Sequence, residues 1–318
     1  MKILFSGYRW GDLTERLESN LPDCEIVHCP IEEILSNLSG IQVIIPAMAK
    51  ITKEIIDAAP DLKLIQQAGV GLEGVDIDAA TQKHIPVANV PSLGSGNAES
   101  VAELAILHMM VLLRRYHHAL DNFQEGVWGQ PLGSTLYGKA IGIIGVGNVG
   151  KTLAKRLRPF EVRLLGLEPF ATPELKQDCG FDWLDQSNLD YLLVNSDIVV
   201  ICAAFNPQLK DMIGKPQFER MKPSAFLVNV ARGGFVNHEA LETTLRNNKI
   251  AGVGLDVFWE EPVDPSDPVF GYNVIATPHV GAATDSSYRG IARKVSDNVK
   301  RLQKGQPVAS CANAAQVY

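Results

Sequence analysis

The chain has 318 residues, enough for about two domains that each bury a hydrophobic core. Hydrophobic residues make up 46% of it and charged residues 20%, as in an ordinary globular protein. The formal net charge of −7 argues against nucleic acid or an anionic membrane as a partner.

The N-terminus and the cysteines bear on where the protein resides. The first residues predict a short strand and no secretory signal peptide, and no run of about 18 apolar residues predicts a membrane span. The five cysteines are an odd and scattered set, which favours reduced thiols in the cytoplasm. Cys24 and Cys29 lack a second cysteine pair, so we expect no zinc or other metal site.

Predicted strands and helices alternate over the first hundred residues. We expect strands at Lys2–Ser6, Glu25–His28, Val43–Pro46, Leu64–Gln67 and Val87–Ala88. Helices fit between them at Asp12–Leu21, Ile31–Leu38, Thr52–Ala59 and Asp78–Lys83. This alternation predicts a parallel sheet with helices on both faces. Arg9 and Trp10 follow the first strand, where they would border a ligand cleft, and Arg9 is a candidate to bind a second anionic group of a substrate.

A long apolar helix is expected next, over Ala98–Phe123. His108, His117 and His118 lie on or near it, and we interpret them as surface or interface residues in preference to metal ligands. A glycine-rich loop then leads to the run Ile141–Gly150, which predicts a buried strand that turns sharply into a helix.

Three glycines of this run form a G-x-G-x-x-G pattern. Gly145 permits a tight turn, Gly147 lets the backbone approach a pyrophosphate, and Gly150 lets the helix pack on the strand. The helix Val149–Arg158 points its N-terminal N–H groups at the phosphates. The pattern predicts a dinucleotide site, and a glycine-rich turn in an α/β fold without a cofactor is the alternative.

An acidic residue follows the next predicted strand. Strand Val162–Leu167 ends in Glu168, about where a dinucleotide-binding fold has a carboxylate for the adenosine ribose. No arginine follows within 169–173 to receive a 2′-phosphate, so the sequence favours NAD over NADP.

Four more apolar runs predict buried parallel strands, at Asp197–Ala204, Ala225–Ala231, Gly252–Val257 and Val274–Thr277. Ser286–Lys304 then predicts an amphipathic helix that returns to the N-terminal domain. We therefore expect a Rossmann-type doubly wound cofactor domain at 101–283, inserted into a smaller flavodoxin-like α/β substrate domain at 1–100 and 284–318. Two chain crossings would form a hinge, with the ligand cleft between the domains.

Three polar residues follow these strands directly: Arg232, Glu261 and His279. The carboxyl ends of parallel strands are where open α/β sheets bind ligands. An arginine there can bind a carboxylate with two parallel N–H bonds, and a histidine can transfer a proton near neutral pH. A carboxylate beside the histidine favours its charged form. Each residue also has a structural alternative, as a turn arginine, an exposed loop acid or a capped loop histidine.

Several motifs in order resemble those of the D-2-hydroxyacid dehydrogenase family over nearly the whole chain. They are Gly69–Asp76, Asn97–Glu103, Leu136–Gly150, Val228–Gly234, Gly254–Pro262 and Thr277–Gly281. The resemblance implies that Arg232, Glu261 and His279 are catalytic: the arginine holds the substrate carboxylate and carbonyl, and the glutamate supports the histidine.

The resemblance also implies binding roles for other residues. Val70 and Gly71 would offer backbone N–H groups to the substrate carboxylate, together with Arg232, and Asp256 would contact the nicotinamide amide. The full set expected to contact the cofactor is Gly145, Gly147, Asn148, Val149, Gly150, Glu168, Ala231, Asp256 and His279.

The chain departs from the family pattern in two places. Cys202-Ala203-Ala204 stands where the family often has His-x-Pro near the cofactor, and Glu168 stands where aspartate is common. The chain also ends at Tyr318, which is too early for the regulatory domain that some phosphoglycerate dehydrogenases carry.

These observations together predict an NAD-dependent oxidoreductase, expected to be a homodimer. It would transfer a hydride between NAD(H) and a small D-2-hydroxy acid or 2-oxo acid, chiefly in the reduction of glyoxylate, hydroxypyruvate or a similar acid. The alternative is an NAD(H)-sensing binding protein of the co-repressor type, which keeps a similar fold and similar motifs.

Overall fold

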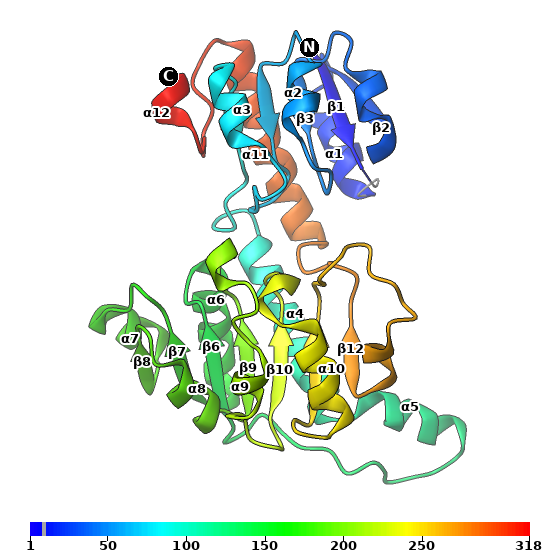
Figure 1. Ribbon diagram of the computed structural model, residues 1–318, viewed down its shortest axis with the longest axis vertical. Helices are drawn as coiled ribbons and strands as arrows, with labels where there is room; N and C mark the ends of the chain where they lie inside the picture. Colours follow the sequence, from blue (N-terminus) through cyan, green and yellow to red (C-terminus); the bar gives the residue numbers. More distant parts are fainter. Residues whose placement is uncertain (8–10) are drawn as a thin grey trace. The chain divides into compact units, whose positions relative to one another are not determined.

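The computed structural model describes residues 1–7 and 11–318. Arg9 and Trp10, which the sequence places beside a cleft, lie outside the described residues. The chain forms two compact units (Figure 1): the first comprises 1–97 with 283–318, and the second comprises 98–282. Within the described residues, no helix is both long enough and apolar enough to cross a bilayer.

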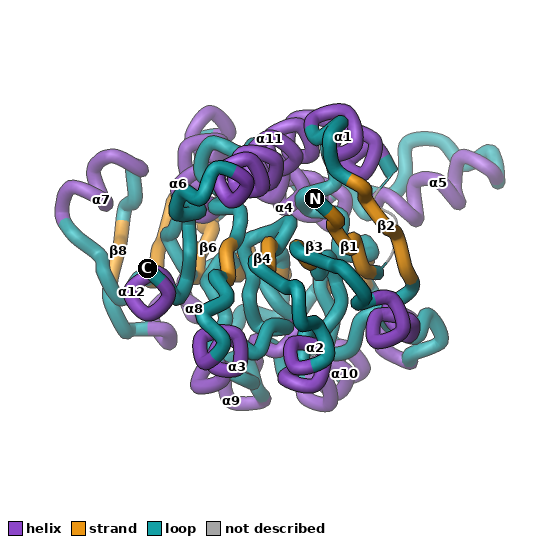
Figure 2. Tube along the Cα trace, turned by 90° about the horizontal axis from the view of Figure 1, so that it is seen from above, coloured by secondary structure: helices purple, strands orange, loops and turns teal. Residues whose placement is uncertain are grey.

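The first unit is built on a parallel sheet with the strand order β2-β1-β3-β4-β5, which is the flavodoxin order. Its strands are β1 (Lys2–Ser6), β2 (Glu25–Cys29), β3 (Val43–Ile45), β4 (Leu64–Gln66) and β5 (Val87–Ala88). Its helices are α1 (Asp12–Asn20), the 3₁₀ helix η1 (Ile31–Asn37), α2 (Lys53–Asp57), α3 (Ile77–Gln82), α11 (Asp285–Gln303) and α12 (Ala314–Val317). Figure 2 shows α1 and α11 together on one face of this sheet and α2 and α3 on the other.

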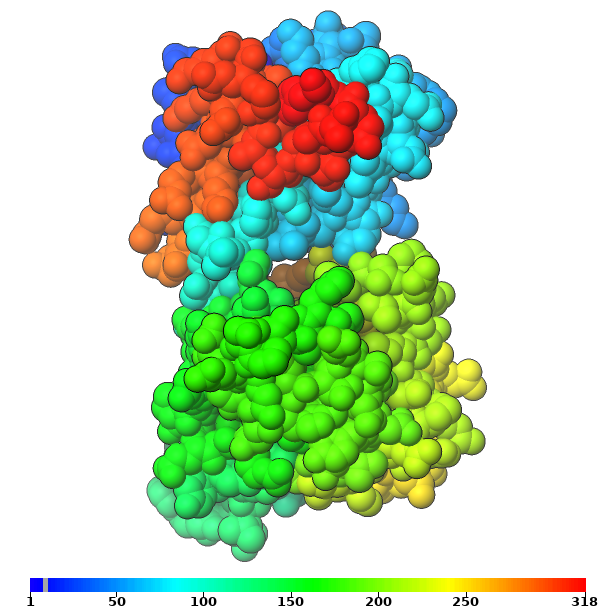
Figure 3. All heavy atoms as spheres, turned by 90° about the vertical axis from the view of Figure 1, so that its left-hand side faces the viewer, coloured from blue at the N-terminus to red at the C-terminus, as the bar shows by residue number. Residues whose placement is uncertain are grey.

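The C-terminal segment is part of the first unit. Cys311 forms an antiparallel bridge with Ala88, and the red C-terminal residues lie beside α11 on the surface in Figure 3. Asn313 is buried and acts as a clamp: its side chain accepts a hydrogen bond from the N–H of Val87 and donates to the carbonyl of Ile85, both at 2.9 Å. The last residues of the chain thereby hold the edge strand β5.

The second unit is built on a parallel sheet with the strand order β12-β11-β10-β9-β6-β7-β8. Its strands are β6 (Ala140–Ile144), β7 (Arg163–Leu167), β8 (Trp183–Asp185), β9 (Ile198–Ile201), β10 (Phe226–Asn229), β11 (Gly252–Leu255) and β12 (Val274–Ala276). The order is the Rossmann order with one added strand. The predicted fold class is thus confirmed for both units.

Helices cover both faces of the second sheet. One hydrophobic core contains residues of α4 (Asn97–Leu113) and α6 (Asn148–Leu157), and another contains residues of α8 (Leu189–Asn195), α9 (Lys215–Phe218) and α10 (His238–Arg246). The remaining helices are α5 (Tyr116–Gln124), α7 (Pro173–Cys179) and the short 3₁₀ helices η2 (Arg158–Phe160), η3 (Pro207–Leu209), η4 (Gly233–Phe235) and η5 (Pro268–Gly271).

The prediction of one helix over Ala98–Phe123 is wrong. The helix ends at Leu113, and Arg115 adopts a left-handed conformation with φ 49° before α5 begins. The later loop returns to this point, where the N–H of Ser134 donates to the carbonyl of Leu113 at 2.8 Å. The two helices also differ in burial, because α4 has nine buried residues and α5 has none.

Candidate active site

The glycine loop joins β6 to α6. Gly145 has φ +86°, and a Cβ on it would overlap the backbone of Ala203. A Cβ on Gly150 would overlap the carbonyl oxygen of Gly145, so only a glycine lets the helix pack this closely. Gly147 caps α6 and faces open space. These three positions have the geometry that a pyrophosphate at the start of α6 requires.

Glu168 lies at the end of β7, beside this loop. Its Oε2 accepts a hydrogen bond from the N–H of Val146 at 2.8 Å, and its Oε1 accepts one from the N–H of Phe170 at 3.2 Å. The carboxylate therefore also holds the glycine loop in place, a role that the sequence did not reveal. It stands next to the loop, where a ribose carboxylate is expected.

The unusual Cys202-Ala203 segment follows β9 on the other side of the glycine loop. The N–H of Cys202 donates to the carbonyl of Ile144 at 2.8 Å, which brings Ala203 against Gly145. Burial raises the pKa of the Cys202 thiol to about 12, which favours its protonated form. Where the family often has His-x-Pro, this chain thus has small side chains beside the glycine turn.

Arg232 follows β10 and begins the turn η4. The buried Asn229 holds this turn, because its side chain donates to the carbonyl of Arg232 at 2.8 Å and accepts from the N–H of Ala231 at 3.1 Å. A Cβ on Gly233 would overlap the backbone of Phe258, so the turn lies directly against the segment that follows β11. The Arg232 guanidinium donates to the carbonyl of Ala231 at 2.7 Å.

Glu261 and His279 form a close pair. The Nδ1 of His279 and the Oε2 of Glu261 are 2.6 Å apart, and the Oε1 of Glu261 accepts a hydrogen bond from the N–H of Phe258 at 2.9 Å. Burial alone would raise the pKa of the Glu261 carboxyl. The hydrogen bond and charge of His279, with smaller contributions from the Phe258 N–H and the charge of Arg232, instead hold that pKa below its usual range.

This arrangement has a direct chemical consequence. Because the carboxylate binds Nδ1, Nε2 is left as the ring nitrogen that can exchange a proton with a ligand. An acid–base pair thus lies at the carboxyl ends of β11 and β12, next to an arginine at the end of β10.

Asp256 anchors the loop that carries His279. It is 2% exposed, and its carboxylate accepts hydrogen bonds from the Thr277 hydroxyl at 2.6 Å and from the N–H groups of Val280 and Gly281 at 2.9 Å. Its backbone carbonyl accepts from the N–H of His279 at 2.8 Å. His279 itself has φ 53°, a costly conformation for a residue with a side chain that is typical of functional sites. The predicted contact of Asp256 with nicotinamide stays a prediction.

Val70 and Gly71 belong to the first unit, in the loop after β4. The side chain of Asn89 donates to the carbonyl of Val70 at 2.7 Å and steadies this loop. Within residues 1–7 and 11–318, the N–H groups of Val70 and Gly71 have no hydrogen-bond partner. They are therefore available to a carboxylate.

The predicted position of His108 is wrong. It is 0% exposed, on the inner side of α4, whereas His117 and His118 on α5 are exposed as expected. A histidine in a buried helix, four residues before the core residue Leu112, was the sequence signal that could have revealed this.

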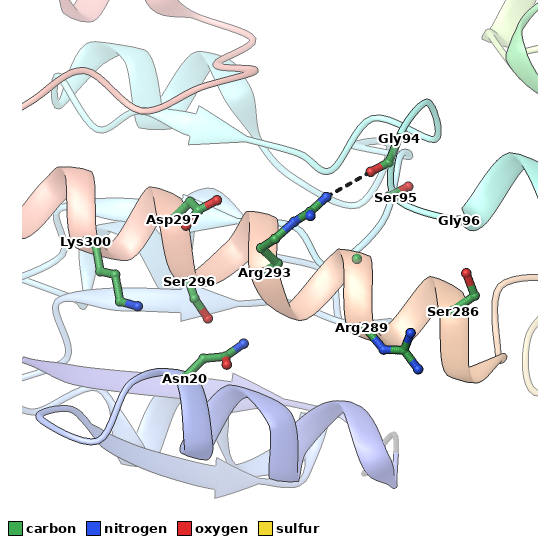
Figure 4. Close-up of a pocket in the computed structure, with 11 residues that line it drawn as sticks. Asn20, Gly94, Ser95, Gly96, Ser286, Arg289, Arg293, Ser296, Asp297 and Lys300 are labelled. Atoms are coloured by element: carbon green, nitrogen blue, oxygen red, sulfur yellow. Dashed lines mark hydrogen bonds between the residues drawn. The ribbon is translucent and has the colours of Figure 1, made fainter.

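A separate groove of about 460 Å³ lies in the first unit (Figure 4). Its lining comes from α11, the end of α1 and the 94–96 loop, with Arg289, Arg293 and Lys300 among the side chains. Arg293 donates to the carbonyl of Gly94 at 3.3 Å. The groove contains none of the residues that the sequence assigns to catalysis or cofactor binding.

Comparison with known proteins shows the family to which the chain belongs. Residues 106–281 match the model of the D-isomer-specific 2-hydroxyacid dehydrogenase NAD-binding domain. The chain is 35% identical over 278 residues to D-3-phosphoglycerate dehydrogenase from Archaeoglobus fulgidus, covering 86% of this chain and 52% of that protein. It thus spans about half the length of the first curated relatives that it matches.

Two further similarities extend over most of both proteins. The glyoxylate reductase of Thermococcus onnurineus is 32% identical over 285 residues, covering 86% of this chain and 84% of that protein. The structure of D-lactate dehydrogenase from Aquifex aeolicus with NAD and lactic acid has a TM-score of 0.82 and 26% identity, covering 95% of this chain and 96% of that one.

Proposed function

Since this chain belongs to the D-isomer-specific 2-hydroxyacid dehydrogenase family, we propose that it is an oxidoreductase acting on a small D-2-hydroxy or 2-oxo acid with NAD(H). Its main direction is the reduction of glyoxylate, hydroxypyruvate or a similar acid. The observation that carries the proposal is the 2.6 Å contact between His279 and Glu261, with Arg232 at the adjoining strand end.

The glycine loop fits the diphosphate of the cofactor. The open space at Gly147 and the first N–H groups of α6, from Asn148 and Val149, would hold the phosphates, and Glu168 would hold the adenosine ribose. Ala231 and Asp256, at the ends of β10 and β11, would lie toward the nicotinamide. When bound, NADH supplies the hydride that adds to C2 of the oxo acid.

The residues of the chain supply binding, orientation and the proton. Arg232 binds the substrate carboxylate and polarises the carbonyl oxygen. As the hydride arrives at C2, the carbonyl oxygen becomes an alkoxide and takes the proton from Nε2 of His279. Glu261 keeps Nδ1 hydrogen-bonded and its charge stabilises the imidazolium before the transfer. In oxidation His279 removes the hydroxyl proton instead.

The protein is also proposed to be a homodimer. Large apolar side chains are exposed on α5 and in the loop that follows it: Tyr116, Leu120, Phe123, Val127, Trp128, Leu132 and Tyr137. Phe123, Trp128 and Leu132 are 74%, 85% and 90% exposed, and such a patch is typical of a protein–protein interface. Light scattering on the protein as it elutes from a size-exclusion column should give a molar mass twice the 34.6 kDa of one chain.

The five cysteines support a cytoplasmic location. They are an odd and scattered set, which favours reduced thiols.

The test is NADH oxidation with a panel of 2-oxo acids: glyoxylate, hydroxypyruvate, pyruvate and branched and aromatic analogues. Wild-type protein should oxidise NADH with at least one of them and yield the D-2-hydroxy acid. Tight NADH binding without turnover on any acid would support the co-repressor-type alternative and contradict the proposal.

A further inference from the structure

A line of partly buried hydrogen bonds runs from the middle of α4 to the loop that carries His279. The Nε2 of His108 lies 3.0 Å from the Thr277 hydroxyl, which lies 2.6 Å from the Asp256 carboxylate. That carboxylate binds the N–H groups of Val280 and Gly281. The line thus connects a residue of α4, 169 positions before Thr277, with the backbone that follows His279.

The direction of these hydrogen bonds follows from the number of protons available. The Thr277 hydroxyl has one proton, which it donates to the nearby oxygen of Asp256. Burial raises the pKa of Asp256, while the hydrogen bonds from Thr277, Val280 and Gly281 favour its charged form. The Thr277 oxygen must then accept from His108, which requires a proton on Nε2. The Nδ1 of His108 then carries only a lone pair. This agrees with its surroundings, because no described residue forms a hydrogen bond with it and it lies against Gly254.

The opposite tautomer is disfavoured on the same grounds. It would bury an Nδ1–H without an acceptor, which costs about 1–3 kcal/mol. The charged form would bury that N–H together with a positive charge, and burial accordingly lowers the pKa of His108 to about 4.

The choice of histidine at this position has no packing reason. Its helix neighbours Ala105, Met109 and Leu112 belong to a hydrophobic core that an apolar side chain would continue. Burying an imidazole is costly unless its hydrogen bonds are made, and the bond that His108 makes goes to Thr277. What this burial provides is therefore order in the 277–281 loop.

We infer that His108 is a positioning residue for His279, acting through Thr277 and Asp256. The inference rests on the proposed function for its kinetic part only. When His108 donates to Thr277, the hydroxyl is held with its proton toward Asp256, and the carboxylate is held between the amides of Val280 and Gly281. The imidazole of His279 then keeps its place beside Glu261. A misplacement of about 1 Å at such a group can cost ~10²-fold in rate.

The kinetic test compares variants at His108 and Thr277. His108→Leu should lower kcat about 10-fold or more with little change in KM for NADH. His108→Gln, whose amide can still donate, should recover most of that loss. The His108→Leu/Thr277→Val double variant should be no slower than Thr277→Val alone, because both act through one connection. Leu112→Val, on the same side of α4, is the packing control and should keep wild-type kcat.

Two measurements test the inference without turnover, so they hold even if the proposed function fails. Imidazole ¹⁵N shifts of the wild type should show His108 protonated on Nε2 and bare on Nδ1. Amide hydrogen exchange at Val280 and Gly281 should accelerate in His108→Leu and stay normal in His108→Gln and Leu112→Val. A proton on Nδ1, unchanged exchange in His108→Leu, or additive effects of the two substitutions would each overturn the inference. If His108→Leu does not fold, the ¹⁵N shifts and the His108→Gln and Thr277→Val variants still decide it.

Discussion

The two units share a parallel α/β architecture, but their buried polar side chains hold different things together. In the first unit, Asn298 of α11 donates to Gln66 of β4 at 2.7 Å and to the carbonyl of Ala309 at 3.0 Å, and Asn313 clamps β5. The bonds to Gln66 and to Val87 join segments that are more than 200 residues apart in the sequence to the same sheet. In the second unit, Asp256 and Thr277 hold one short loop.

Burial of polar side chains thus has a different result in each unit. A buried polar group is unfavourable unless its hydrogen bonds are made, so each one strongly favours a single arrangement. In the first unit that arrangement is the path of the chain, and in the second it is the geometry of the proposed site. Substitutions should therefore affect stability in one unit and turnover in the other.

His279→Asn should show the largest effect, and it should fall on turnover alone. Loss of a general acid lowers kcat by about 10²–10⁴-fold, whereas NADH binding should persist. Asparagine tolerates a positive φ, so the fold should survive. The control is His84→Asn, an exposed histidine of the first unit with φ 54°, close to the 53° of His279. Near-normal reduction by His279→Asn at neutral pH would show that the proton comes from elsewhere.

Asn313→Ala should lower the stability of the first unit and leave turnover unchanged. It leaves the buried N–H of Val87 and carbonyl of Ile85 unpaired, and each such loss costs about 1–3 kcal/mol. We expect the free energy of unfolding of the first unit to fall by about 2–4 kcal/mol in urea, with unchanged kcat below the transition. Gln316→Ala, at an exposed position nearby, should change neither. Wild-type stability in Asn313→Ala would contradict the assigned role of the clamp.

Arg232→Lys should impair use of the oxo acid. An ammonium cannot reproduce two parallel N–H bonds, and a hydrogen bond to a charged group contributes about 1.5–3 kcal/mol. We therefore expect kcat/KM for the oxo acid to fall about 10–100-fold while KM for NADH stays similar. Arg220→Lys, an exposed arginine that pairs with Asp190, is the control and should be neutral. An equal increase in the KM for the oxo acid and in the KM for NADH would point to a general disturbance of the turn.

Glu261→Gln should shift the pH profile of reduction. The low pKa of Glu261 keeps its carboxylate charged at neutral pH, where it favours the charged form of His279. Without that charge, the decline of kcat/KM at high pH should move to lower pH. As the pH falls through the lowered pKa of Glu261, the wild-type carboxylate becomes protonated and loses its charge. The profiles of the wild type and of Glu261→Gln should then converge. Glu260→Gln, at the exposed neighbouring position, should leave the profile unchanged, and an unshifted profile in Glu261→Gln would argue against the pair.

Cofactor preference should show the smallest change. Wild-type protein should have a higher kcat/KM with NADH than with NADPH, because Glu168 repels a 2′-phosphate. Glu168→Gln keeps an oxygen for the Val146 amide and removes the charge, so the gap should narrow without loss of the glycine loop. Glu168→Ala should also narrow the difference between NADH and NADPH, but it should weaken the binding of both cofactors. A wild-type preference for NADPH would overturn the assignment.

Much of the fold could be predicted because long apolar runs determine buried parallel strands. The prediction for β1 matches its observed bounds, and those for β6 and β10 differ at their ends. The edge strand β8 was not predicted, since its three residues are only partly buried and form no apolar run. The break after α4 had no signal either, because Arg115 turns the chain where a glycine or proline would be expected.

The site shows a similar division. The sequence could single out Arg232, Glu261 and His279 because polar residues directly after buried parallel strands often bind ligands. The topology brings those strand ends together. The part played by His108 could not be predicted, because its partner Thr277 is 169 residues away and a histidine in a helix gives no hint of its contacts.

The discontinuous first unit also has a consequence for synthesis on the ribosome. Residues 1–97 emerge first, but α1 packs against α11, and α11 follows only after residues 98–282. At about 5–20 residues per second, translation of that intervening segment takes roughly 10–40 s. During this interval the N-terminal strands have no α11 to cover one face of their sheet, and only at its end does the second unit have its whole chain. The first unit can therefore finish folding only after the second unit has been synthesised, because it needs α11 to cover its sheet.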